Sequence, residues 1–204
     1  MNKFIPAITG LAIILSPLAA NADPNKTGPY IKLGAEAVIL KASDIQTSTF
    51  GPIGNLSYKT GFGGSGAVGY HVNSSLSLEA EYTYRQNETD KFAGFKATGS
   101  EYKNHAFMGN AIVDIDTGTK FKPYVGAGIG YAISDAGGGD TDGKLAYQGM
   151  AGVDYNLTPS TQFYMGYKYF ASLTPKFSDS SGFGNYKVPY KSHNVELGIK
   201  FNLN

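Results

Sequence analysis

The chain has 204 residues, a formal net charge of +1 and no cysteine, which favours a single domain and excludes a disulfide-stapled scaffold. The near balance of 17 basic and 16 acidic residues gives no reason to expect nucleic acid or another strongly anionic partner. Glycine, tyrosine and phenylalanine, with 27, 15 and 12 copies, favour strands over helices.

The N-terminal segment has the features of a cleaved secretory signal peptide. Lys3 precedes an uncharged apolar stretch, and Ala20-Asn21-Ala22 forms a small-x-small cleavage site. An N-terminal anchor helix is the alternative, but the segment is short for a membrane span and ends in a cleavage site. We therefore expect residues 1–22 to be removed and residues 23–204 to form one outer-membrane β-barrel domain.

From Gly28 onward, apolar and polar residues alternate with a period of two, which places them on opposite sides of a strand. The clearest case runs from Leu76 to Arg85, where every even position is apolar or aromatic. No apolar run approaches the roughly 18 residues of a transmembrane helix. The pattern predicts strands at 30–39, 60–70, 76–85, 103–115, 121–132, 144–155, 161–170 and 191–201.

The connections between these strands alternate in length. Short polar turns are expected at 71–75, 116–120 and 156–160, and longer links at about 40–59, 86–102, 133–143 and 171–189. Short periplasmic turns alternating with long outer loops are typical of outer-membrane barrels. We therefore predict an all-β fold, an eight-stranded antiparallel up-and-down transmembrane β-barrel.

Alternation alone does not decide which side of the strands faces inward. A soluble lipocalin-like or streptavidin-like cup would point its apolar side into the barrel. Here the polar side is rich in glycine and carries balanced charges, as a narrow lumen requires, and eight strands leave an interior that side chains just fill. The predicted lumen charge network, a polar plug, consists of Lys32, Glu36, Glu79, Glu81, Arg85, Asp114, Lys122, Asp154, Lys168, Glu196 and Lys200.

Aromatic residues gather near both ends of the predicted strands, as the two membrane interfaces favour. The strands are also long enough to cross a bilayer when tilted. The predicted interfacial aromatics are Tyr30, Tyr70, Tyr82, Tyr84, Tyr131, Tyr147, Tyr155, Phe163, Tyr167, Tyr169 and Phe201.

Four segments carry a resemblance to a known family: 121–131 (FKPYVGAGIGY), 146–155 (AYQGMAGVDY), 165–170 (MGYKYF) and 192–201 (SHNVELGIKF). They resemble the opacity-type outer-membrane proteins, and related rickettsial surface antigens and adhesins share these features. The resemblance implies a monomeric eight-stranded barrel in the Gram-negative outer membrane, with four outer loops that contact host molecules or antibodies.

Other motifs are better explained by the barrel. The glycines between Gly126 and Gly130 lack the following helix of a dinucleotide loop and suit a crowded lumen. Asp140 and Asp142 could hold calcium, but a single such unit favours a plain loop. Adjacent Ser192 and His193 point to opposite sides of a strand and cannot act as nucleophile and base. We expect no enzyme activity, no cofactor and no metal.

Three functions stay open at this stage. The first is adhesion or another surface interaction through the loops, whose predicted contact residues are Phe50, Ile53, Phe177 and Phe183. The second is a narrow porin-like channel for small solutes, gated by the lumen charges. The third and weakest is a lipid-modifying hydrolase. Expected partners are outer-membrane lipid and lipopolysaccharide, and host surface or matrix proteins, with no nucleic acid.

Overall fold

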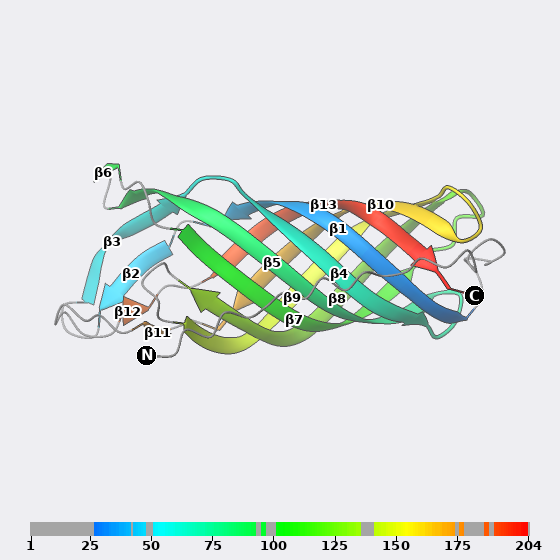
Figure 1. The fold of residues 1–204 in the computed structure, drawn as a ribbon, viewed down its shortest axis with the longest axis horizontal. Coiled ribbons are helices and arrows are strands. Elements are labelled where there is room, and N and C mark those ends of the chain that lie inside the picture. Colours follow the sequence, from blue (N-terminus) through cyan, green and yellow to red (C-terminus); the bar gives the residue numbers. More distant parts are fainter. Residues whose placement is uncertain are drawn as a thin grey trace, which may run out of the picture.

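Eight long strands form a closed antiparallel barrel in the computed structural model (Figure 1). Hydrogen-bonded neighbours follow the order β1–β4–β5–β7–β8–β9–β10–β13, and β13 returns to β1. This confirms the predicted fold. The barrel strands are β1 (Gly28–Leu40), β4 (Gly61–His71), β5 (Leu76–Phe92), β7 (Glu101–Asp114), β8 (Phe121–Asp135), β9 (Thr141–Asn156), β10 (Thr161–Ser172) and β13 (Lys191–Asn202).

The structure describes residues 27–41, 43–47, 51–92, 95–96, 101–135, 141–173, 176–177, 186–187 and 190–203. The predicted signal peptide at 1–22 lies outside these ranges. Within them, no helix is long and apolar enough to cross a membrane.

Three tight turns lie together at one end of the barrel, here called the turn end. Asn73 accepts hydrogen bonds at Oδ1 from the backbone N–H groups of Ser75 and Leu76, at 2.9 and 2.8 Å. Asp116 accepts one from Gly118, whose φ of +67° is a left-handed conformation that glycine adopts without strain. These turn residues explain why the predicted short connections at this end are correct.

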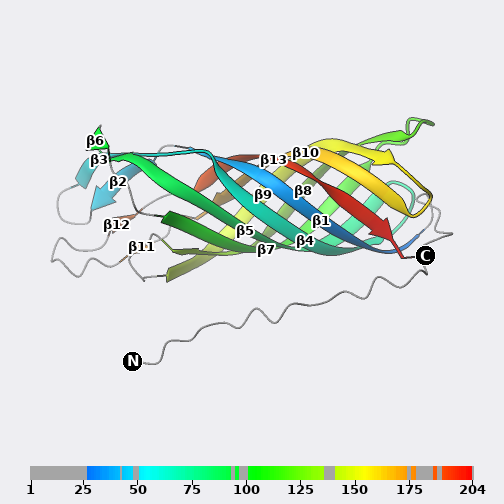
Figure 2. The same cartoon turned by 45° about the horizontal axis from the view of Figure 1, so that its top comes forward.

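The opposite end, here called the loop end, holds more regular structure than predicted (Figure 2). Strands β2 (Ser43–Thr47) and β3 (Gly51–Tyr58) form a hairpin within the link expected at 40–59, and β3 pairs with the end of β5. Strand β12 (Tyr186–Lys187) pairs with β2 and with β11 (Lys176–Phe177), and β6 (Phe95–Lys96) pairs with β5. Three of the four long connections therefore contribute to one small sheet above the rim.

The barrel strands bury their polar side and expose their apolar side. Val68 and Ile129 are 62% and 77% exposed, whereas Arg85 is fully buried. This arrangement is the reverse of a soluble cup, in which the apolar side would form the interior. The cylinder is therefore polar or charged at its centre and apolar on its outer wall, as a bilayer requires.

Candidate functional site

All eleven charges predicted for the lumen project to the inner side of the barrel. Asp114, near the turn end of β7, is half-buried. The ten that are buried are Lys32, Glu36, Glu79, Glu81, Arg85, Lys122, Asp154, Lys168, Glu196 and Lys200. Five cations thus face six carboxylates inside a narrow cylinder, where an unpaired charge is costly.

The seam between β1 and β13 aligns like charges. Glu36 lies opposite Glu196, and Lys32 lies opposite Lys200, an arrangement that destabilises a sheet if left uncompensated. Diagonal and cross-lumen contacts compensate it, because Lys32 Nζ lies 4.0 Å from Glu196 Oε2 and Lys200 pairs with Asp154 of β9. The charges therefore form a connected network and not a set of facing pairs.

Glu196 is the centre of this network. Its Oε1 accepts hydrogen bonds from the hydroxyls of Ser65 and Tyr164, at 2.5 and 3.1 Å, and its Oε2 lies 3.3 Å from Lys168 Nζ. The same Lys168 ammonium donates to both carboxylate oxygens of Glu81 at 3.0 Å. Since β10 and β5 lie on opposite sides of the barrel, the Lys168–Glu81 pair crosses the lumen.

A second layer, which is aromatic, closes the lumen on the loop side of the charges. The Phe170 ring lies over the Arg85 guanidinium, 4.3 Å from its central carbon, and Arg85 Nε lies 2.6 Å from Glu36 Oε1. Tyr190 packs against Phe170 and Tyr102, with ring centroids 5.7 and 5.3 Å apart. The buried cluster comprises Leu40, Tyr102, Ala106, Met108, Ala132, Ala146, Phe170 and Tyr190. The prediction of a purely polar plug is therefore incomplete.

Tyr30 does not lie on the outer wall, contrary to its predicted interfacial position. It is 1% exposed and donates a hydrogen bond to Glu79 Oε2 at 3.2 Å inside the lumen. The prediction used its place near a strand end and overlooked its parity, since even-numbered residues of β1 face inward. Its ring fills the space over Gly69, where an added Cβ would lie 2.1 Å from Tyr30 Cζ.

At the turn end, a histidine joins three strands. His71 Nδ1 lies 2.8 Å from Ser77 Oγ, and its Nε2 lies 3.0 Å from Asn202 Oδ1. Ser77 Oγ in turn lies 3.4 Å from Asp114 Oδ2. Because both ring nitrogens are hydrogen-bonded to protein groups, His71 ties β4, β5 and β13 together.

The other ten predicted interfacial aromatics belong to the outward side of their strands. Tyr70, Tyr82, Tyr131, Tyr147, Phe163 and Tyr167 are between 40% and 51% exposed. Tyr84, Tyr155, Tyr169 and Phe201 are partly exposed.

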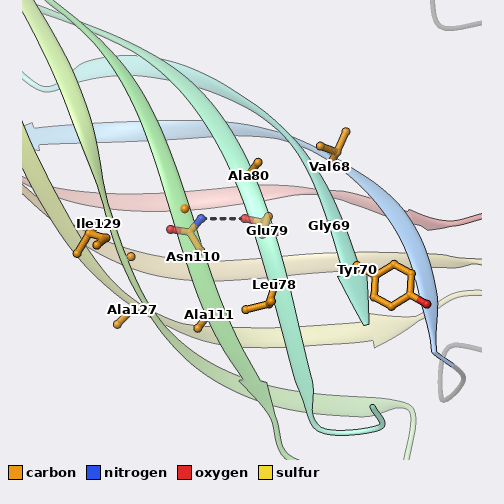
Figure 3. Close-up of a pocket in the computed structure, with 12 residues that line it drawn as sticks. Val68, Gly69, Tyr70, Leu78, Glu79, Ala80, Asn110, Ala111, Ala127 and Ile129 are labelled. Carbon is orange, nitrogen blue, oxygen red and sulfur yellow. Dashed lines mark hydrogen bonds between the residues drawn. The ribbon is translucent and has the colours of Figure 1, made fainter. Parts of the chain in front are cut away.

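A hollow of about 780 Å³ lies on the outer wall across β4, β5, β7 and β8 (Figure 3). The small side chains Ala80, Ala111 and Ala127 form its floor between larger apolar neighbours. Two polar residues also line it, Glu79 and Asn110, but their side chains hydrogen bond to each other at 3.1 Å on the lumen side. The hollow therefore has the apolar chemistry of the rest of the outer wall.

Other residues singled out in the sequence do not converge. Ser192 is buried in the lumen, whereas His193 lies on the outer wall. Gly126 packs against Met150 inside the barrel, so the glycine run serves close packing. Asp140 lies outside the described residues, as does the side chain of Asp142.

The predicted loop contacts cannot be placed in a common site. Phe50 and Phe183 lie outside the described residues, as do the side chains of Ile53 and Phe177, although their backbones belong to β3 and β11. Near the rim, Lys59 donates a 2.9 Å hydrogen bond to Glu88, and this bond raises the pKa of the Lys59 ammonium.

Comparison with known sequences identifies one matching family. A family model described as "Outer membrane protein beta-barrel domain" matches residues 8–202. A protein named "Outer membrane protein" from Gluconacetobacter diazotrophicus is 31% identical over 173 residues, which cover 70% of this chain and 45% of that protein. "Major surface antigen 4" of Anaplasma marginale is 28% identical over 167 residues, covering 68% and 58%. The chain spans about half the length of these curated relatives.

Solved structures show the same architecture. Neisserial surface protein A has a TM-score of 0.58 at 21% identity, with 86% of this chain and 97% of that chain covered. The outer membrane protein OprG of Pseudomonas aeruginosa has a TM-score of 0.65 at 18% identity, with 89% and 100% covered. At these identities the likeness concerns the fold alone.

Proposed function

Because this chain belongs to the outer membrane protein beta-barrel family, we propose that it acts as a surface protein through its extracellular loops, with the barrel serving a structural role in the envelope. The barrel lies in the outer membrane of a Gram-negative cell. In such barrels the short turns face the periplasm and the long connections face outward, which makes the loop end extracellular. The proposed activity is adhesion to, or another contact with, a partner outside the cell.

The main support for this proposal is that side chains fill the lumen. The Lys168–Glu81 pair crosses the interior, and the aromatic layer around Phe170 and Tyr190 lies between this pair and the extracellular opening. A solute path would have to break buried ion pairs and displace packed rings. The lumen charges that were candidates for a gate therefore favour a structural network, and the porin-like alternative has no described feature in its favour.

The loop end provides the second support. Three long connections contribute strands to the small sheet β11–β12–β2–β3–β5, so they form a shared platform above the rim. A relative is named as a major surface antigen, and proteins recognised at the cell surface expose such loops. We also propose that the chain is not an enzyme, because Ser192 and His193 face opposite sides of the barrel wall.

A binding screen tests this proposal. The refolded barrel is applied to immobilised fibronectin, laminin, collagen and serum proteins, beside variants in which residues 43–56 or 176–187 are replaced by a Gly-Ser linker. A barrel with the same linker in place of residues 116–119, at the periplasmic end, serves as the matched control. We expect the parent and the control to bind and the loop variants to lose binding. Equal binding by all four proteins, or no binding by the parent, would overturn the proposal.

The channel alternative is tested separately in planar bilayers. We expect the inserted parent protein to produce no conductance steps, since its lumen is closed in two layers. Stepwise conductance that survives the linker replacements would assign the activity to the lumen instead.

A further inference from the structure

Two of the three histidines occupy matching positions on the outer wall. On the seam of β5 and β7, His105 lies opposite Tyr84. Tyr82 lies two residues from Tyr84 on β5, on the same face and further from the loop end. On the seam of β10 and β13, His193 lies opposite Tyr169, and Tyr167 follows one step deeper. In both places a Tyr-x-Tyr pair on one strand thus meets a histidine on the next.

The contacts within the two clusters agree closely. Tyr82 Oη lies 2.9 Å from His105 Nδ1, and Tyr167 Oη lies 2.5 Å from His193 Nδ1. The second tyrosine ring lies 5.0 Å from His105 in one cluster and 5.3 Å from His193 in the other, tilted by 54° and 58°. Since the tyrosine hydroxyl occupies Nδ1, a further ligand would bind each ring through its Nε2.

A lysine lies two residues before each histidine, on the same face of the strand and nearer the extracellular rim. Lys103 lies opposite Gln86, and Lys191 lies opposite Ala171. Each cluster therefore presents, from the rim downward, an ammonium group, an imidazole and two phenols. Two strands separate the clusters in either direction around the barrel, so they lie on opposite sides of it.

Position and charge indicate what this set of groups binds. The clusters belong to the extracellular girdle, at the depth where lipid headgroups replace hydrocarbon. An ammonium beside an imidazole suits a phosphate that is flanked by sugar hydroxyls. The hydroxyls of Tyr82, Tyr84 and Tyr167 are already hydrogen-bonded to His105, Gln86 and His193, so these tyrosines position the histidines and contribute their rings. We propose that each cluster binds one phosphorylated headgroup of an outer-leaflet glycolipid, the lipid A part of lipopolysaccharide.

The two sites differ in their acidic neighbours. Lys103 Nζ is 2.8 Å from Glu101, and Asp135 lies opposite Lys103 on β8. Beside Lys191, by contrast, the N–H of Lys41 donates to the Lys191 carbonyl at 2.9 Å, which brings a second lysine to that rim. The site with His105 is therefore the weaker of the two, because a phosphate there must compete with Glu101 for Lys103 and lies near the Asp135 carboxylate.

Native mass spectrometry of the refolded full barrel tests this proposal, with bisphosphorylated hexa-acyl lipid A and the same lipid without phosphates as probes. The variants are Lys191→Gln with His193→Phe, Lys103→Gln with His105→Phe, and all four changes together. Phenylalanine keeps a ring against the tyrosines, and Lys120→Gln at the periplasmic turn is the matched control. The heat-dependent gel mobility of each variant shows whether it has folded.

The parent and the control should retain two bisphosphorylated lipids. The His193 variant should lose the tighter one with at least about a tenfold drop in affinity, the His105 variant the weaker one, and the fourfold variant both. Phosphate-free lipid should bind no better to the parent than to the fourfold variant. Equal retention of both probes, or two bound lipids on the folded fourfold variant, would overturn the proposal and leave the clusters as plain aromatic anchors. This outcome is independent of loop-mediated adhesion.

Discussion

Replacing Lys168 with methionine should destabilise the barrel more than any single change at an exposed lysine. The Lys168 ammonium is almost fully buried and lies 3.0 Å from Glu81 and 3.3 Å from Glu196. At an effective dielectric constant of 20, each contact contributes about 5 kcal/mol of attraction. Desolvation of the lysine offsets much of this sum, but methionine leaves two carboxylates without their shared cation. We therefore expect unfolding to become easier by about 3–5 kcal/mol.

The assay is urea unfolding of the protein in lipid vesicles, followed by tyrosine fluorescence and by heat-dependent gel mobility. Lys120→Met, at an exposed turn, serves as the control and should remain within about 0.5 kcal/mol of the parent. The double variant Lys168→Met with Glu81→Gln should recover part of the loss, because it removes a stranded charge together with its partner. If Lys168→Met proves as mild as the control, the ionic network does not hold the lumen closed and the reasoning fails.

Three further outcomes follow from the packing. Gly69→Val should lower the free energy of unfolding by about 1–3 kcal/mol in the same assay, because its Cβ would meet the Tyr30 ring. Gly149→Ala should be neutral, because nothing lies within 4 Å of an added Cβ there; equal effects of the two changes would contradict this. Ile129→Lys should lower the free energy of unfolding by about 2–4 kcal/mol if Ile129 faces hydrocarbon, and Ile129→Val should change it little. If the lysine variant is as stable as the parent, this part of the outer wall faces water. Phe170→Ala should cost about 3–5 kcal/mol yet stay silent in planar bilayers, since the ionic layer remains; conductance would show that the aromatic layer alone closes the lumen.

Most of the correct predictions rest on the alternation of apolar and polar residues with a period of two. It identified the eight barrel strands, and it correctly predicted that Lys32 and Glu196, far apart in the chain, both face the lumen. This was possible because lipid outside and ion pairs inside require opposite chemistry at alternate positions. It also indicated that Ser192 and His193 face opposite ways. The ends of strands were less predictable: β5 runs to Phe92, seven residues past its predicted end, because β3 and β6 supply hydrogen-bonding partners there.

The apolar part of the lumen was not predicted, and Tyr30 was placed on the outer wall because its residue type was given more weight than its position in the alternation. Phe170 shares its side of β10 with Lys168, and Tyr30 shares its side of β1 with Lys32, so parity alone places both inside. Tyr30 was instead assigned to the membrane interface because it lies near a strand end, and no position was predicted for Phe170. Which lysine meets which carboxylate was beyond prediction, since those contacts depend on register and on side chains that cross the lumen, as Lys168 does.

The pairing of β1 with β13 has a consequence for how the barrel is made. During secretion β1 enters the periplasm first and β13 last, so one edge of β1 stays open until Lys191–Asn202 arrives. The same late strand delivers Glu196, the carboxylate shared by Lys32 and Lys168. A chain cut short before β13 therefore carries two defects at once, a bare backbone edge and a lumen that lacks both the Glu196 carboxylate and the Lys200 partner of Asp154. The final barrel strand, twelve residues long, therefore supplies both the backbone edge that closes the sheet and two of the charges that fill its interior.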